Sequence, residues 1–105
     1  MNGTSPMVTL EGASLRVSGE VDAVSVVALR KQGEKLIDGA EGSLAVDLSG
    51  LATAHSVVLS MLMCWHRLAL SKQLALSFEG ASDRLLSLAA LSNLEARLPG
   101  FTAHS

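Results

Sequence analysis

The sequence predicts a single α/β domain with a mixed β-sheet of about four strands and about three to four packed α-helices. Two short alternating runs at the start indicate a hairpin. Segments typical of strands and helices then alternate, which favours parallel strands joined by helical crossovers. A chain of 105 residues that is 49% hydrophobic is long enough to bury one core, which we expect to span about residues 8–98 of the single domain 1–105.

The hairpin is expected from Met7–Glu11 and Leu15–Gly19, in which apolar and polar residues alternate on either side of a Gly-Ala-Ser connection. Apolar residues then recur at helical spacing from about Ser25 to Asp38, which predicts an amphipathic helix lying on the sheet. Either Asp22 or Ser25 is suited to cap the start of this helix, and Gly39 is suited to follow its end as the C′ residue.

The remaining elements alternate in the same way. Ser43–Leu48 is nearly continuous in apolar residues, which predicts a central strand covered on both faces between parallel neighbours. We expect a second helix from Ser56 to about Ser71, a strand over Gln73–Phe78, and a third helix over Ser82–Leu91 with Ser82 as its cap. The tail, residues 94–101, has room for one more short element at most.

Composition narrows the class of protein. A net charge of −2 lacks the basic surface that nucleic-acid binders use to neutralise phosphates, so we expect no nucleic-acid partner. The polar residues 1–6 do not resemble a secretory signal, and the longest apolar segment, residues 57–65, is too short to span a membrane. A lone cysteine fits a reducing compartment. These features predict a cytoplasmic protein with no membrane span.

Catalytic and metal-binding patterns are not evident in the sequence. His55, His66 and His104 are too scattered to indicate a metal site, and Cys64 lacks the neighbours of a catalytic thiol. Glycine-rich nucleotide-binding motifs are absent as well. We therefore expect a protein that is not an enzyme and that holds no cofactor or metal. Asp47 is expected to tie down the loop that follows its strand.

The second helix is apolar on more of its circumference than core packing requires. Seven residues share one broad side, which we assign to the core: Val57, Val58, Met61, Leu62, Trp65, Leu68 and Ala69. The opposite side carries Ser56, Ser60, Arg67 and Ser71, with Leu59, Met63 and Leu70 among or beside them. Three apolar residues around a polar stripe suit a docking surface for another protein, and they equally suit coverage by neighbouring loops.

Four segments together resemble the STAS family, the sulfate transporter and anti-sigma factor antagonist domains. They are Ser18–Asp22 before a helix, Val46–Leu51, the serine that opens the second helix, and Leu76–Gly80. The resemblance covers about residues 8–98. Within the family, Trp65-His66-Arg67 and the run Leu85–Leu94 are most similar to the small cytoplasmic subunits of phospholipid ABC transporters.

This resemblance implies an accessory subunit that binds and supports the ATPase of an inner-membrane ABC transporter, and through it the permease. The complex would move phospholipids and maintain the lipid asymmetry of the outer membrane. The subunit itself would be cytoplasmic and peripheral to the inner membrane through its partner. The residues expected to contact the partner are His55, Ser56, Leu59, Ser60, Met63 and Arg67.

The alternative function is an anti-sigma factor antagonist switched by phosphorylation of Ser56. In STAS proteins the loop before the second helix usually reads Asp, then Ser or Thr, then a small residue, then Gly. Here those positions are His55, Ser56, Val57 and Val58, so the hydroxyl is kept while the acid and the glycine are not. This departure disfavours recognition by a kinase. Ser56 is also suited to a purely structural role as an N-cap worth about 1 kcal/mol.

Overall fold

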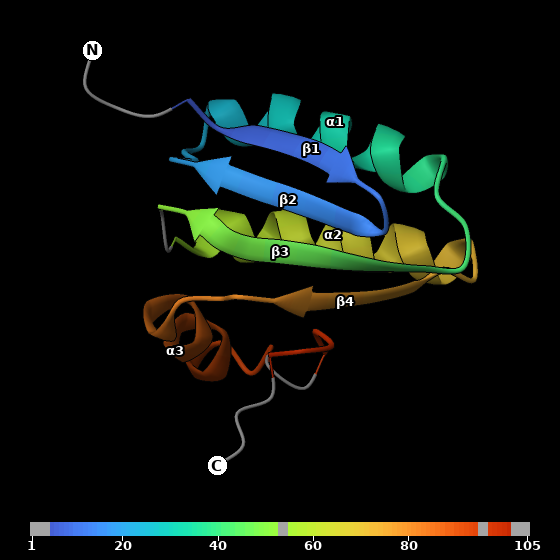
Figure 1. Ribbon diagram of the computed structural model, residues 1–105. Coiled ribbons are helices and arrows are strands. Elements are labelled where there is room, and N and C mark those ends of the chain that lie inside the picture. The colour runs from blue at the N-terminus through green and yellow to red at the C-terminus, as the bar shows by residue number, and fades with distance from the viewer. Residues whose placement is uncertain (1–4, 53–54, 95–96, 102–105) are drawn as a thin grey trace.

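The sheet at the centre of the fold has four strands in the order β1-β2-β3-β4. The structure is a computed structural model that describes residues 5–52, 55–94 and 97–101. Its elements are β1 (Met7–Glu11), β2 (Ser14–Gly19), α1 (Ser25–Asp38), β3 (Ser43–Leu51), α2 (Ser56–Ser71), β4 (Ala75–Glu79) and α3 (Asp83–Leu91) (Figure 1). β1 and β2 pair antiparallel and the other pairs are parallel, which confirms the expected hairpin and mixed sheet.

The helices α1 and α2 lie side by side against one face of the sheet, and α3 lies beyond the β4 edge (Figure 1). Strand residues that face α1 and α2, such as Val17 and Val46, are buried, whereas Arg16 and Ser77 on the other face are exposed. The expectation that the third strand is covered on both faces is therefore wrong. Ala45 points to the open face, and because it is apolar it lengthened the hydrophobic run without being a core residue.

The N-cap residue of α1 is Val24, so the expectation of Asp22 or Ser25 at that position is wrong, although both contribute hydrogen bonds before the helix. Asp22 Oδ1 accepts from the backbone N–H groups of Val24 and Ser25 at 3.0 and 2.7 Å, and Ser25 Oγ accepts from the Asp22 N–H at 3.0 Å. This reciprocal arrangement resembles a capping box. At the other end, Gly39 is the C-cap with φ −91°, so the expectation of a C′ glycine there is wrong.

β3 is three residues longer than the sequence predicts. A register shift between Arg16 and Ser18 lets the end of β2 pair with Gly50 and Leu51. The extra pairing carries β3 beyond Leu48, the last residue of its apolar run. Sequence periodicity does not detect such an extension, because it depends on a neighbouring strand.

β4 begins at Ala75, two residues later than predicted. Gln73 has a left-handed backbone with φ 60°, and the Leu74 N–H donates to the Ala69 carbonyl at 2.9 Å. The left-handed residue and this hydrogen bond are features of a Schellman motif that ends α2. Gln73 therefore belongs to the helix terminus rather than to the strand. At α3, Ser82 Oγ accepts from the Leu85 N–H at 3.1 Å, which confirms the predicted cap.

The outer edge of β4 is covered by the C-terminal segment, residues 97–101. The Phe78 N–H donates to the Pro99 carbonyl at 2.8 Å, and the rings of Phe78 and Phe101 meet edge to face with centroids 5.7 Å apart. Phe101 is almost fully buried. Covering this edge protects strand hydrogen-bonding groups that would otherwise invite pairing with another chain.

Candidate partner-binding site

The first residues of α2 lie at the sheet edge where β3 ends. His55 is the N-cap residue, with an extended backbone and no side-chain capping bond. Ser56 is the first helical residue, so its expected role as the N-cap is wrong. Its side chain is exposed, and its hydroxyl makes no hydrogen bond to any other described residue. The Ser56 hydroxyl is thus available to a molecule outside the domain.

α2 presents an outer ridge to solvent that runs the length of the helix. We define it as Ser56, Ser60, Met63, Arg67, Leu70 and Ser71, of which Met63 is half-buried and the others are exposed. On the expected core side five residues are buried, and Val57 and Leu68 are half-buried. The predicted division of the helix into a core side and a polar side is confirmed, apart from one residue.

Leu59 is the exception, because its side chain is only 1% exposed and belongs to the hydrophobic core. The expectation that Leu59 faces outward beside the ridge is wrong. A helical wheel assigns burial only to the helix side that faces the sheet. Leu59 lies on the flank of the first turns of α2, and it also packs into the core. Leu59 therefore stabilises the domain and is removed from the set of exposed contact residues.

One flank of the ridge borders a small apolar hollow between α1 and α2, with a volume of about 150 Å³. Its lining residues are Val26, Val27, Arg30, Val57, Ser60, Met61 and Cys64. The only charged group among them, Arg30, is paired with Glu34 at 2.8 Å. This apolar hollow is therefore suited to an uncharged side chain.

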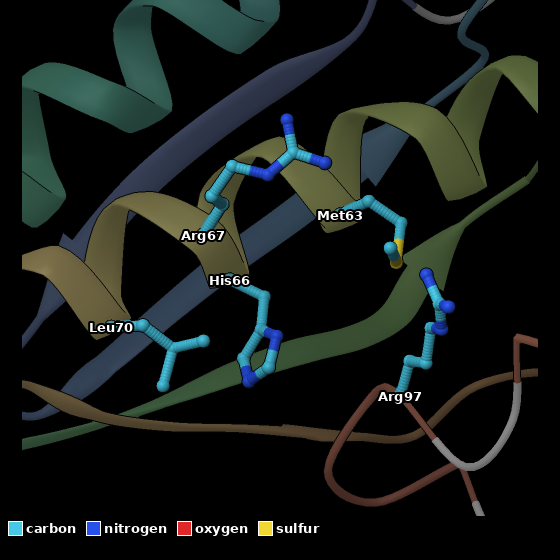
Figure 2. Close-up of a pocket in the computed structure, with 5 residues that line it drawn as sticks. All are labelled: Met63, His66, Arg67, Leu70 and Arg97. Atoms are coloured by element: carbon cyan, nitrogen blue, oxygen red, sulfur yellow. The ribbon is translucent and has the colours of Figure 1, made fainter.

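The other flank borders a larger hollow of about 350 Å³, lined by Met63, His66, Arg67, Leu70 and Arg97. Figure 2 shows Arg97 extending from the C-terminal segment with its guanidinium directed toward Met63 on α2. We call this the cationic hollow, because two arginines and no acidic residue are found among the described residues that line it. Arg97 was not expected from the sequence, because no local pattern places a residue thirty positions beyond Arg67 in the lining of the same hollow.

The charged groups at the ends of the strands have structural roles. Asp47 Oδ1 accepts from the hydroxyl and the N–H of Ser49 at 2.7 and 3.0 Å. These bonds, aided by the charge of Arg16, lower the pKa of Asp47. Because β3 is longer than expected, Asp47 organises the end of its own strand rather than the loop after it.

Groups suited to metal binding do not converge in the part of the chain that the structure describes. No set of three His, Cys, Asp or Glu side chains there is placed to hold a metal ion. His104, considered with the other histidines, lies outside the described residues. No described helix is both long and apolar enough to cross a membrane. The outer ridge of α2 is thus a solvent-facing surface that lies between the two hollows.

Comparisons with known proteins agree with this architecture. A crystal structure of an anti-sigma factor antagonist from Mycobacterium paratuberculosis is similar with a TM-score of 0.70 and 20% identity, over 93% of this chain and 85% of that one. The unphosphorylated anti-sigma factor antagonist SpoIIAA gives a TM-score of 0.68 and 15% identity, over 85% and 81%. At these identities the likeness shows a shared fold.

The sequence itself identifies the family. No curated protein matches the chain at the level of sequence. A family model described as "Mlab, STAS domain" matches residues 7–100, which include every described helix and strand and both hollows. The chain therefore belongs to the STAS-domain family that this model describes.

Proposed function

We propose that this protein is a non-catalytic accessory subunit that binds and supports the ATPase of an inner-membrane ABC transporter for phospholipids. The family model that matches the chain carries the name Mlab, and the resemblance drawn from Trp65-His66-Arg67 and Leu85–Leu94 points to the same branch of STAS proteins. In this proposal the subunit is held at the inner membrane by its partner, and the complex helps to maintain outer-membrane lipid asymmetry.

The observation that carries the proposal is the outer ridge of α2 between two hollows. Ser56 and Ser60 are small and exposed, so the backbone of a partner can approach the helix closely at these positions. The hollows on either side have room for side chains of the partner, one apolar and one cationic. Interfaces of this kind gain most of their affinity from a few anchors seated in such depressions.

Of the residues expected to contact the partner, five lie on or beside this surface. Ser56, Ser60, Met63 and Arg67 belong to the ridge, and His55 is exposed immediately before it. Leu59 is excluded by its burial. The proposed contact surface therefore consists of the ridge, His55 and the rims of the two hollows.

An anti-sigma factor antagonist is the second candidate, and two observations favour it. Both similar structures are of anti-sigma factor antagonists. The Ser56 hydroxyl is exposed and without a hydrogen-bonding partner among the described residues. A phosphate at Ser56 would add about −1.5 to −2 charges to the start of α2. Intact-mass measurement of the protein isolated from its native cells separates the candidates, because a phosphorylated fraction that is lost in Ser56→Ala supports the antagonist.

The transporter proposal is tested by co-expression with the ABC ATPase encoded in the same genome, followed by size-exclusion chromatography. Ser60→Trp places a bulky side chain on the ridge and is expected to abolish co-elution. Ser87→Trp is the matched control, because Ser87 is an exposed serine on α3 that lines neither hollow. The proposal is refuted if wild-type protein does not co-elute with the ATPase, or if both variants co-elute as the wild type does.

A further inference from the structure

The cationic hollow differs in charge from a neighbouring depression beside α1. This depression is lined by Lys31, Glu34, Lys35 and Asp38 together with Leu68, so its charges balance. The described lining of the cationic hollow has two arginines and no acid. This local excess of positive charge occurs on a protein whose net charge is −2. These two depressions thus have different electrostatic character.

The two arginines of the cationic hollow are not neutralised within the described residues. The ion pairs found there are Arg30 with Glu34 and Lys72 with Asp38, and neither Arg67 nor Arg97 takes part in one. Both side chains are exposed. A guanidinium has five N–H donors in a fixed fork that matches a carboxylate in a two-point contact. Arg67 and Arg97 both line the hollow, on opposite sides of Met63 in Figure 2, and each presents unused donors.

The remainder of the lining consists of two apolar side chains, Met63 and Leu70, and the imidazole of His66. Leu70, near the C-terminal end of α2, is 63% exposed, and Met63 lies half-buried opposite Arg97 (Figure 2). Methionine adjusts its shape easily to an incoming group. The hollow thus combines an apolar floor with a cationic rim.

We infer that the cationic hollow binds an acidic segment of the partner protein, in which an apolar side chain is flanked by Asp or Glu. The apolar side chain would contact Met63 and Leu70 beside the His66 imidazole, and the carboxylates would pair with Arg67 and Arg97. The inference rests on the proposed function for the identity of the partner, and it adds the chemistry of the segment that is recognised.

An anionic membrane surface is the other ligand with this charge, and the structure favours it less. Recognition of anionic lipid surfaces typically uses clusters of about four to eight Lys or Arg. Here the hollow offers two arginines and one exposed leucine on a chain of net negative charge. Two fork-shaped donors around a small apolar floor fit a short peptide segment better than a broad, negatively charged surface.

The test compares the double variant Arg67→Glu/Arg97→Glu with Arg84→Glu in binding to the purified ATPase. Arg84 is an exposed arginine of α3 that lies outside the lining of the hollow, so its variant makes the same charge change elsewhere. We expect the double variant to bind on the order of 100-fold more weakly and the control to bind as the wild type does. Wild-type affinity is expected to fall with added salt, because the hollow is open to solvent.

The outcomes separate this inference from the proposed function. If the double variant binds as tightly as the wild type while Ser60→Trp still abolishes binding, the inference is overturned and the proposed function stands. If the wild type does not bind the ATPase, both fail. If the wild type floats with phosphatidylglycerol vesicles and the double variant does not, the hollow binds lipid and the inference is overturned. Circular dichroism checks that each variant is folded.

A second measurement identifies the segment. Leu70 is replaced by the photo-crosslinking residue p-benzoylphenylalanine, the complex with the ATPase is irradiated, and the attached peptide is identified by mass spectrometry. The inference predicts a peptide of the ATPase in which Asp or Glu flanks the attachment point. Attachment to a peptide without acidic residues overturns it.

Discussion

The indole of Trp65 in α2 lies directly over Gly33 in α1, so that a β-carbon at position 33 would overlap the ring. The indole N–H donates to the Arg30 carbonyl at 3.1 Å, one turn before Gly33. This contact sets how closely the two helices approach. The apolar hollow beside Ser60 lies between the same helices, so its width depends on the same contact.

Gly33→Ala is expected to destabilise the domain, although alanine is the better helix former. The added methyl group must displace the fully buried Trp65 side chain, and overpacking of this kind costs about 1–3 kcal/mol. The gain in helix propensity offsets at most about 1 kcal/mol of that loss. Urea unfolding measures the net change in the free energy of unfolding.

Gly39→Ala is the matched control, because Gly39 has a right-handed backbone and a β-carbon there would make only ordinary van der Waals contacts. It should leave stability unchanged or raise it by up to about 1 kcal/mol. If Gly33→Ala is as stable as Gly39→Ala, the close packing of α1 on Trp65 is not what fixes the spacing of the helices.

His55→Asp is expected to stabilise the protein by about 1 kcal/mol. His55 already has the extended backbone of an N-cap residue, but its side chain caps nothing and the first turn of α2 holds no acidic residue. An aspartate there can accept from the free N–H groups, and its charge is favourable at the helix N-terminus. For a domain of this size, thermal unfolding should show a rise of about 4–8 °C.

The opposite change at α3 provides the comparison. Ser82→Ala removes the hydroxyl that accepts from the Leu85 N–H and should cost about 1 kcal/mol. If the His55→Asp variant is no more stable than the wild type, the backbone N–H groups at the start of α2 already have hydrogen-bond partners.

Stability should fall in acid partly through Asp22. The Ser25 N–H and Oγ and the Val24 N–H hold the pKa of Asp22 below its usual 3.8. Because the folded pKa is lowered, the stabilisation is fully present above the unfolded pKa and is lost as pH falls through the folded pKa. Asp22→Asn keeps an oxygen acceptor but cannot ionise. Its free energy of unfolding should therefore change less steeply with pH below about 4 than that of the wild type.

Denaturant titrations at a series of pH values make this comparison. Asp47, whose pKa is lowered by Ser49, leaves part of the acid dependence in place in both proteins. Equal pH slopes in wild type and Asp22→Asn would mean that the cap is not formed by the charged carboxylate in solution.

Gly100→Val is expected to detach the C-terminal segment from β4. Gly100 has φ +99°, and a β-carbon there would collide with the Phe78 carbonyl oxygen. The strained backbone alone costs about 1–3 kcal/mol. Release of the segment would also expose Phe101 and the β4 edge, so light scattering should show association as well as a lower unfolding midpoint.

Pro99→Ala is the control for this change, because it keeps the carbonyl that accepts from the Phe78 N–H. It should have a much smaller effect than Gly100→Val. If the two variants are equally stable and equally monomeric, residues 97–101 do not protect this edge.

Local signals predicted the elements well and tertiary packing poorly. Alternation and helical spacing gave the hairpin and all three helices, and Ser82 was recognised as a cap from its position alone. The strand ends were less well predicted, because β3 is extended by its pairing with β2 and Gln73 takes a left-handed conformation. Both effects depend on contacts or backbone angles that residue type does not specify.

The same limit applies to the candidate site. The polar side of α2 follows from its periodicity, so Ser56, Ser60 and Arg67 were found from the sequence. The burial of Leu59 and the approach of Arg97 arise from chain segments distant in sequence, and no pattern within α2 reports them. The proposed partner comes from the family resemblance, whereas the chemistry of the two hollows could be described only from the structure.

The most direct test of the central claim is the accessibility of the α2 ridge in the complex with the ATPase. In a Cys64→Ala background, Ser60→Cys and Ser87→Cys are labelled with a maleimide before and after the ATPase is added. We expect the ATPase to protect the cysteine at position 60 from labelling and to leave the cysteine at position 87 unprotected. Formation of the complex with unchanged labelling of residue 60 would contradict it.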